Sequence, residues 1–128
     1  MQSCVVKPDK SAEYYFKEGC HILEVLNSAD DPALSIARAR VAPGVTTRLH
    51  ALKGTAERYY ILSGEGQVTV GELMQSVDEG DVVCIAPGAA QQITNTSNVD
   101  LIFLALCTPR FEVDNYLELC LLLSTSFV

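Results

Sequence analysis

His50 and Glu57 are the residues of this 128-residue chain whose types and spacing best suit chemistry. The imidazole of His50 stands seven residues before the carboxyl group of Glu57, and both groups can bind a first-row transition metal or transfer a proton. Tyr59 adds a phenol, and Gln91 adds an amide oxygen, which is a neutral and hard donor. These four side chains are therefore the candidates for a metal or catalytic site.

Short segments rich in β-branched residues must position these side chains. Turn sequences such as NSADDP, APG, SGEG and APGAA separate the segments, and helix signals are almost absent before residue 110. This spacing predicts an antiparallel sandwich or barrel, with a tight hairpin where Gly64 and Gly66 flank Glu65. The nine segments are His21–Leu26, Ser35–Val41, Thr46–Leu52, Glu57–Leu62, Gln67–Val70, Glu72–Val77, Asp81–Ile85, Gln91–Asn95 and Leu101–Cys107.

Alternation along a strand decides which side chains share a face. Residues two positions apart in a strand point to the same face. This predicts three sets of neighbours, each on one face: Arg48, His50 and Leu52; Glu57 and Tyr59; and Gln91 and Ile93. If these faces line one barrel interior, His50, Glu57, Tyr59 and Gln91 meet there.

Two spaced motifs run through the segments. They read Gly44-VTTRL-His50-Ala-Leu52-KGTA-Glu57-RYYILS-Gly64 and Gly80-DVVCI-Ala86-Pro87-Gly88-AA-Gln91-QIT-Asn95. In order and spacing the chain resembles a small single-domain bacterial cupin over roughly residues 35–111. The resemblance implies an all-β fold, the double-stranded β-helix or jelly-roll cupin barrel.

The chain departs from the family's ligand pattern at two positions. Leu52 stands where the family has its second histidine, and Gln91 stands where it has the third. The resemblance therefore implies His50, Glu57 and Gln91 as the remaining ligands of one weakly bound divalent ion, Zn²⁺, Mn²⁺, Fe²⁺ or Ni²⁺. The alternative is a hydrogen-bonded polar cluster of the same three side chains around water.

A ligand pocket is expected at the barrel mouth. Its predicted lining is Arg48, Leu52, Tyr59, Gln91 and Ile93. Arg48 suits a pair with Glu57 or a carboxylate or phosphate ligand, the alternative being a solvated position. His50, Glu57 and Tyr59 are the candidates for catalysis, although Tyr59 also suits the core.

Composition argues against other classes of partner. Sixteen acidic residues against nine basic ones give a net charge of −7, so nucleic acid is not expected. Five cysteines without a CxxC pair, and an N-terminus that lacks a signal peptide, predict free thiols in the cytoplasm. No membrane contact is expected, because the apolar run at 117–123 is too short to span a bilayer.

The chain is expected to form a single domain. Residues 1–34 are a lead that packs on the barrel or on a partner, residues 35–111 form the barrel, and residues 112–128 form a tail containing a short helix or a strand. Six of the seven residues at 117–123 are apolar. Because such a run is poorly tolerated in water, we expect it to be buried in a homodimer.

Three functions fit these features. The first is a small-molecule-binding cupin with a degenerate metal site at the barrel mouth and a sugar-like or carboxylated ligand. The second is a metal-dependent isomerase or dioxygenase of the cupin superfamily. The third is a structural or regulatory partner protein whose barrel is plugged by side chains such as Leu52 and Ile93. Whether the protein is an enzyme stays open at this point.

Overall fold

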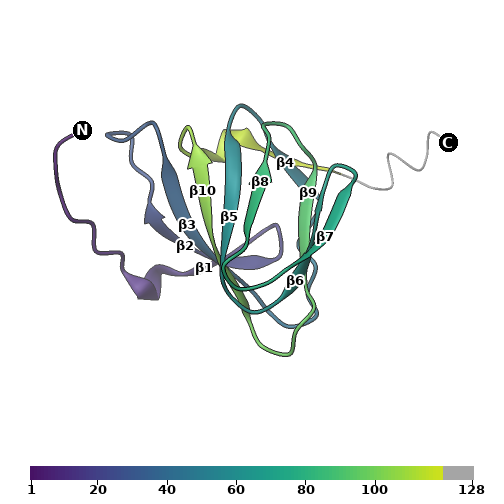
Figure 1. Ribbon diagram of the computed structural model, residues 1–128. Coiled ribbons are helices and arrows are strands. Elements are labelled where there is room, and N and C mark those ends of the chain that lie inside the picture. The colour runs from purple at the N-terminus through teal and green to yellow at the C-terminus, as the bar shows by residue number, and fades with distance from the viewer. Residues whose placement is uncertain (120–128) are drawn as a thin grey trace.

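The computed structural model describes residues 1–119, and the regular secondary structure within them is almost entirely β-strand (Figure 1). Two 3₁₀ turns, η1 (Lys10–Ala12) and η2 (Val113–Asn115), are the helical elements of this range. The strands are β1 (Tyr14–Phe16), β2 (Cys20–Leu26), β3 (Ser35–Val41), β4 (His50–Leu52), β5 (Ala56–Ser63), β6 (Gly66–Val70), β7 (Leu73–Val77), β8 (Val82–Ile85), β9 (Gln91–Asn95), β10 (Leu101–Thr108) and β11 (Tyr116–Glu118).

The strands form two antiparallel sheets, in the jelly-roll arrangement. The six-stranded sheet has the order β1-β2-β3-β10-β5-β8, and the five-stranded sheet has the order β11-β4-β9-β6-β7. Each of the nine segments expected from the alternation contains one strand, so the predicted all-β fold is confirmed. β1 and β11 have three residues each, too few for alternation to reveal them.

The segment Thr46–Leu52 is only partly a strand. Regular pairing begins at His50, and Thr46 forms an isolated bridge with Thr94. In between, the backbone N–H of Arg48 donates to the carbonyl of Glu18 at 2.6 Å. The alternation between residues 48 and 50 is therefore broken.

The turn at Glu65 joins the two sheets, so the expected hairpin is wrong. β5 lies in the six-stranded sheet and β6 in the five-stranded one. Gly64 has a φ of +87°, and a Cβ there would lie 2.7 Å from the carbonyl oxygen of Asp100. A Cβ at Gly66 would lie 2.7 Å from the carbonyl oxygen of Thr94. Both glycines are required by the close approach of backbone at this corner.

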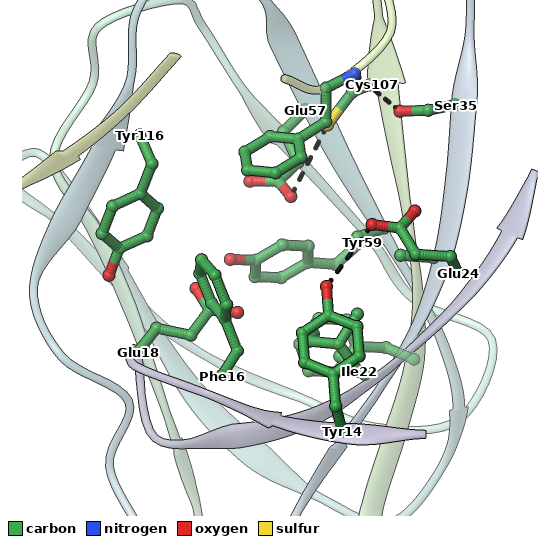
Figure 2. Close-up of a pocket in the computed structure, with 15 residues that line it drawn as sticks. Tyr14, Phe16, Glu18, Ile22, Glu24, Ser35, Glu57, Tyr59, Cys107 and Tyr116 are labelled. Carbon is green, nitrogen blue, oxygen red and sulfur yellow. Dashed lines mark hydrogen bonds between the residues drawn. The ribbon is translucent and has the colours of Figure 1, made fainter. Parts of the chain in front are cut away.

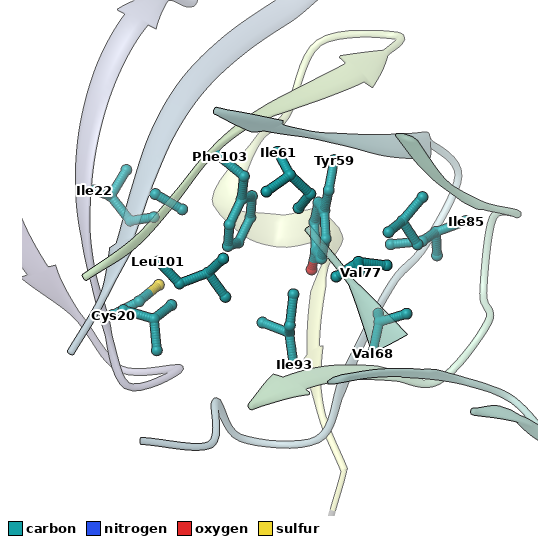
Figure 3. Close-up of a cluster of buried hydrophobic side chains, with 13 residues drawn as sticks. Cys20, Ile22, Tyr59, Ile61, Val68, Val77, Ile85, Ile93, Leu101 and Phe103 are labelled. Carbon is teal, nitrogen blue, oxygen red and sulfur yellow. The ribbon is translucent and has the colours of Figure 1, made fainter. Parts of the chain in front are cut away.

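The main core lies between the two sheets (Figure 3). Its central residues, Ile61, Ile93 and Leu101, have no exposed surface. Burial of each such side chain stabilises the fold by about 1.5–3 kcal/mol. The cluster consists of Cys20, Ile22, Ala39, Val41, Tyr59, Ile61, Val68, Val77, Val83, Ile85, Ile93, Leu101 and Phe103.

Both ends of the described chain contribute strands to the sheets. β1 and β2, from the expected lead, extend the six-stranded sheet, because Ile22 pairs in register with Ala39 of β3. η2 and β11 follow the expected barrel, and β11 pairs with β4. Most of the apolar run at 117–123 lies outside the described residues. Within residues 1–119, no helix is long and apolar enough to cross a membrane.

Candidate functional site

A cavity of about 60 Å³ lies on the inner face of the six-stranded sheet (Figure 2). The strand register explains it. Ala37 and Ala105 are cross-strand neighbours in a row that runs from Glu24 to Tyr59. Cross-strand neighbours point to the same face, so two short side chains in the middle of the row leave a hollow. The lining is Tyr14, Phe16, Glu18, Ile22, Glu24, Ser35, Ala37, Ala39, Glu57, Tyr59, Phe103, Ala105, Cys107, Phe111 and Tyr116.

Glu57 places a buried carboxyl group on the wall of this cavity. The side chain is on β5, and only 8% of the residue surface is exposed. The thiol of Cys107 lies 3.8 Å from Oε2, and Oε1 has no hydrogen-bond partner within residues 1–119. Burial raises the pKa of Glu57 to about 8, and the charge of Glu18 adds to the rise, against the opposing effects of Gln91 and Cys107. The carboxyl group is therefore largely protonated at neutral pH.

Gln91 is held by Tyr59. The phenol of Tyr59 donates a hydrogen bond to Oε1 of Gln91, and both side chains are buried. Burial also raises the pKa of Tyr59 well above its ordinary value, so the phenol stays a donor. The amide nitrogen of Gln91 has no hydrogen-bond partner in the described part of the chain. The free end of this amide is consequently a donor, whereas a metal needs an acceptor.

His50 is opposite Gln91 in the pairing of β4 with β9. Its Nδ1 lies 2.8 Å from the carbonyl oxygen of Arg48, and its Nε2 lies 3.1 Å from Oε2 of Glu18. The ring of Tyr116 stacks on the imidazole, with centroids 5.0 Å apart. Both ring nitrogens of His50 therefore already face oxygen atoms of the protein.

Glu18 is the site residue that the sequence analysis missed. It lies in the turn between β1 and β2, ahead of both motifs, and its carboxylate lines the cavity. Besides the contact with His50, its Oε1 accepts from the thiol of Cys20 at 3.0 Å. Gly19, with a φ of +98°, is the only local signal, because it marks a turn that folds Glu18 back onto the barrel.

Comparison with known protein families shows which family the chain belongs to. The family model for the cupin domain (Cupin_2) matches residues 37–107. The chain belongs to the cupin family.

Two relatives of this cupin are similar over most of their length. An uncharacterized protein of Methanocaldococcus jannaschii is 35% identical over 106 residues, which cover 81% of this chain and 85% of the relative. The oxalate-binding protein of Thermotoga maritima is 36% identical over 89 residues, which cover 70% of this chain and 73% of the relative.

Solved structures agree on the fold. A predicted oxalate decarboxylase from Thermotoga maritima superposes with a TM-score of 0.66 at 30% identity, covering 81% of this cupin and 93% of that chain. The nucleoside dehydratase Pac13 of Streptomyces has a TM-score of 0.75 at 15% identity, covering 91% and 92% of the two chains. At that identity the likeness to Pac13 is one of fold alone.

The cavity of this cupin differs from the predicted pocket. Of the five residues expected to line it, Tyr59 alone does so. Arg48 lies outside, with 62% of its side chain exposed and an ion pair to Glu118 at 3.1 Å, because the broken alternation turns it outward. Leu52 and Ile93 are buried in apolar clusters. Gln91 lies fully buried behind Tyr59.

The side chains at the cupin ligand positions do not fit a metal ion. Leu52 packs against Cys107 and Tyr116 and offers no donor. Nε2 of His50 faces Glu18, and Oε1 of Gln91 already accepts from Tyr59. Among residues 1–119, no three His, Cys, Asp or Glu side chains converge so as to hold an ion. The donor set therefore does not support the divalent ion that the resemblance implied.

Proposed function

We propose that this cupin binds a small molecule in the cavity beside Glu57, and that protein atoms contact the ligand directly rather than through a metal ion. One observation carries the proposal. Oε1 of Glu57 and the hydroxyl of Tyr116 are buried in residues that line the cavity, and neither has a hydrogen-bond partner within residues 1–119. Buried polar atoms in native proteins are nearly always hydrogen-bonded, so two orphans in one cavity support a ligand there.

The size of the cavity limits the ligand. A volume of about 60 Å³ holds a few water molecules, since each needs roughly 10–15 Å³. The ligand, or the part of it that enters, therefore has few heavy atoms. The lining is mainly aromatic and aliphatic, so the buried part of the ligand is largely apolar.

A metal-dependent isomerase or dioxygenase is the second candidate function. One Thermotoga maritima relative is named a predicted oxalate decarboxylase, which supports an enzyme of the cupin superfamily but names neither an isomerase nor a dioxygenase. Two features of this chain count against it. Three glutamates and no lysine or arginine line the cavity, which disfavours a dianion such as oxalate, and the donors at the ligand positions do not suit a metal.

The plugged barrel is the third candidate function. Leu52 and Ile93 are buried and fill the part of the barrel interior next to them, as that hypothesis requires. The hollow beside Ala37 and Ala105 stays open, however, and it contains the orphan atom of Glu57. Binding is therefore favoured over a purely structural role.

Ligand-induced thermal stabilisation tests the proposal. The full chain is screened against tetramethylammonium, glycerol and oxalate as representatives of three charge classes, with and without EDTA. We expect at least one class to raise the melting temperature in EDTA, because a ligand that binds only the folded state stabilises it.

Variants locate the binding in the cavity. Glu57→Gln and Tyr116→Phe should each weaken that stabilisation. Tyr60→Phe is the matched control, because Tyr60 is 43% exposed on the outer face of β5. Binding that EDTA abolishes, or that Glu57→Gln and Tyr116→Phe leave unchanged, contradicts the proposal.

A homodimer is a further part of the proposal. Leu117 and Leu119, at the end of the described chain, are 43% and 37% exposed, and these leucines support contact with a second copy. Light scattering on the full chain and on a version ending at Leu119 tests it. The shorter version keeps β11, which pairs with β4 and belongs to the barrel. A monomeric full chain contradicts the dimer, and a dimeric truncated chain excludes residues 120–128 as its cause while leaving Leu117 and Leu119 as the candidate contact.

We also propose a cytoplasmic location. Cys4, Cys20, Cys84 and Cys107 are free thiols, two of them exposed. Free thiols of this kind are typical of a reducing compartment. Fractionation of cells that express the chain at its native level tests this.

A further inference from the structure

We infer that the ligand of this cavity is a small organic cation, an amine or a quaternary ammonium group, held between the carboxylates of Glu18 and Glu57 and the aromatic side chains around them (Figure 2). This inference rests on the proposed function, because it names the ligand class of the same cavity. Two independent observations lead to it, one from the charges of the lining and one from its aromatic rings.

The charged side chains that line the cavity are all acidic. Glu18 already accepts from the thiol of Cys20, and its Oε2 lies 3.1 Å from Nε2 of His50. Glu24, at the exposed rim, lies 3.4 Å from the hydroxyl of Tyr14. Glu57 is more than nine-tenths buried and keeps Oε1 unpaired. An ionised carboxylate buried without a partner is costly, so burial alone keeps this group protonated, whereas a bound cation stabilises the ionised form and its proton passes to solvent.

The rings of the lining form a surface that attracts positive charge. Phe16 and Tyr116 meet edge to face, with centroids 5.2 Å apart and planes at 87°. The chain's own Lys17 shows the attraction, because its ammonium nitrogen lies 4.5 Å from the centroid of Tyr116 and 5.9 Å from that of Phe16. Cations within about 6 Å of a ring centroid are stabilised by the ring quadrupole. The same wall that holds Lys17 therefore suits a second ammonium group inside the cavity.

Other ligand classes fit this lining less well. An anion meets only carboxylates, because Lys17 and Arg48 are not among the lining residues. A sugar needs many hydrogen-bonding partners, whereas most of the wall is aromatic or aliphatic and the free polar atoms are those of Glu57 and Tyr116. A cation with an alkyl surface satisfies both the charge and the apolar wall.

Titration calorimetry on the full chain tests the charge of the ligand. The probes are tetramethylammonium chloride, ethylammonium chloride, the neutral tert-butanol and sodium oxalate, with potassium chloride at matched ionic strength as the control. We expect at least one organic cation to bind at least about tenfold more tightly than tert-butanol and more tightly than potassium. If tert-butanol binds as tightly, or oxalate more tightly, the cation inference is overturned while binding in the cavity stands. If no probe binds, the cation inference fails, and the separate thermal screen decides the proposed function.

Charge variants sharpen the result. Glu57→Gln keeps the shape of the side chain but cannot ionise when a cation binds, so cation binding should weaken by roughly 30-fold or more, with little change for tert-butanol. Glu72→Gln, which removes an exposed carboxylate distant from the cavity lining, should change neither. Equal losses for the cation and for tert-butanol indicate a merely structural role and overturn the inference. If Glu57→Gln does not fold, Glu18→Gln carries the same comparison.

Discussion

Two parts of the barrel interior differ in what fills them. Around Leu52 the space is closed, because Cys107 and Tyr116 pack against this leucine. Around Ala37 and Ala105 the space is open, since neither side chain reaches across the hollow. The place of the cavity therefore follows the size of side chains on neighbouring strands rather than the positions at which the family carries its metal ligands.

The same contrast holds for the polar groups. His50 has both ring nitrogens within hydrogen-bond distance of oxygens, from Arg48 and Glu18. Glu57, seven residues later in the same motif, leaves one carboxyl oxygen without a partner in the described chain. A satisfied buried group stabilises the fold, while an unsatisfied one destabilises it unless a ligand compensates. The four predictions that follow test this difference between the closed and the open part.

The largest effect is expected for Leu52→His in the closed part. The variant loses apolar packing against Cys107 and Tyr116 and buries an imidazole without a partner. We expect the free energy of unfolding to fall by about 3–5 kcal/mol in EDTA, measured by urea denaturation. Leu52→Met, which keeps the volume, is the control and should cost less than about 1.5 kcal/mol.

Zinc or manganese added to Leu52→His extends the test. The new imidazole supplies a second nitrogen beside His50, so a metal that restores most of the lost stability would mean that the site lacked only this ligand. A destabilisation below about 1 kcal/mol in EDTA would instead mean that the closed part is not tightly packed.

The next effect is the pH dependence that Glu57 gives the fold. Its pKa in the folded state, about 8, lies above the ordinary value of 4.5, so the folded state binds more protons between these values. The stability that Glu57 contributes is therefore fully present below about pH 4.5 and is lost as the pH rises through 8. Each unit of pKa difference corresponds to about 1.4 kcal/mol, and we expect Glu57→Gln to recover about 3 kcal/mol at pH 8 relative to pH 5.

Urea denaturation at several pH values between 5 and 8 measures this difference. The groups that set the pKa of Glu57 are its burial, the charge of Glu18, the Gln91 amide and the Cys107 thiol. Glu72→Gln serves as the exposed control and should keep the wild-type profile. If the profiles of wild type and Glu57→Gln run parallel, the carboxyl group of Glu57 is solvated and burial does not raise its pKa.

Most of the fold was predictable because it depends on local signals. β-Branched segments between turn residues indicate nine of the strands, and the resemblance to cupins that the two motifs carry implies the jelly roll. The sequence around Gly64 and Gly66 predicts a hairpin, whereas the structure has a corner between two sheets. The turn residues are the same in both cases, so the sequence does not show whether the two strands pair with each other.

The site was less predictable because it depends on contacts between distant segments. Parity predicts that His50, Glu57 and Gln91 point inward, and all three residues are buried. It failed for Arg48, where the chain leaves the strand conformation at residues 47–49. Glu18 has only the neighbouring Gly19 as a local signal, and the hollow beside Ala105 has none, since each arises from how separate strands and turns meet.

Filling the open part is the third test. Ala105→Leu places a larger side chain in the row between Ala37 and Tyr59, so it should occupy the hollow. We expect tetramethylammonium, or whichever probe the wild type binds, to lose at least about tenfold in affinity, equivalent to about 1.4 kcal/mol. Leu106→Met, one position along β10 and on its other face, is the control. Unchanged affinity in Ala105→Leu would place the ligand elsewhere.

The smallest effect is expected for Arg48→Ala, which tests the boundary of the open part. The sequence gives Arg48 the parity of His50, whereas the structure leaves it on the surface with Glu118. The two side chains are 62% and 50% exposed, and exposed ion pairs contribute from nothing to about 1 kcal/mol. We therefore expect a loss of at most about 0.5 kcal/mol in urea denaturation and no change in ligand affinity. Glu118→Gln, which breaks the same pair from the other side, should have a similarly small effect. If Arg48→Ala lost tenfold in ligand affinity while Glu118→Gln kept the wild-type affinity, Arg48 would contact the ligand. The ligand would then be an anion rather than the proposed cation.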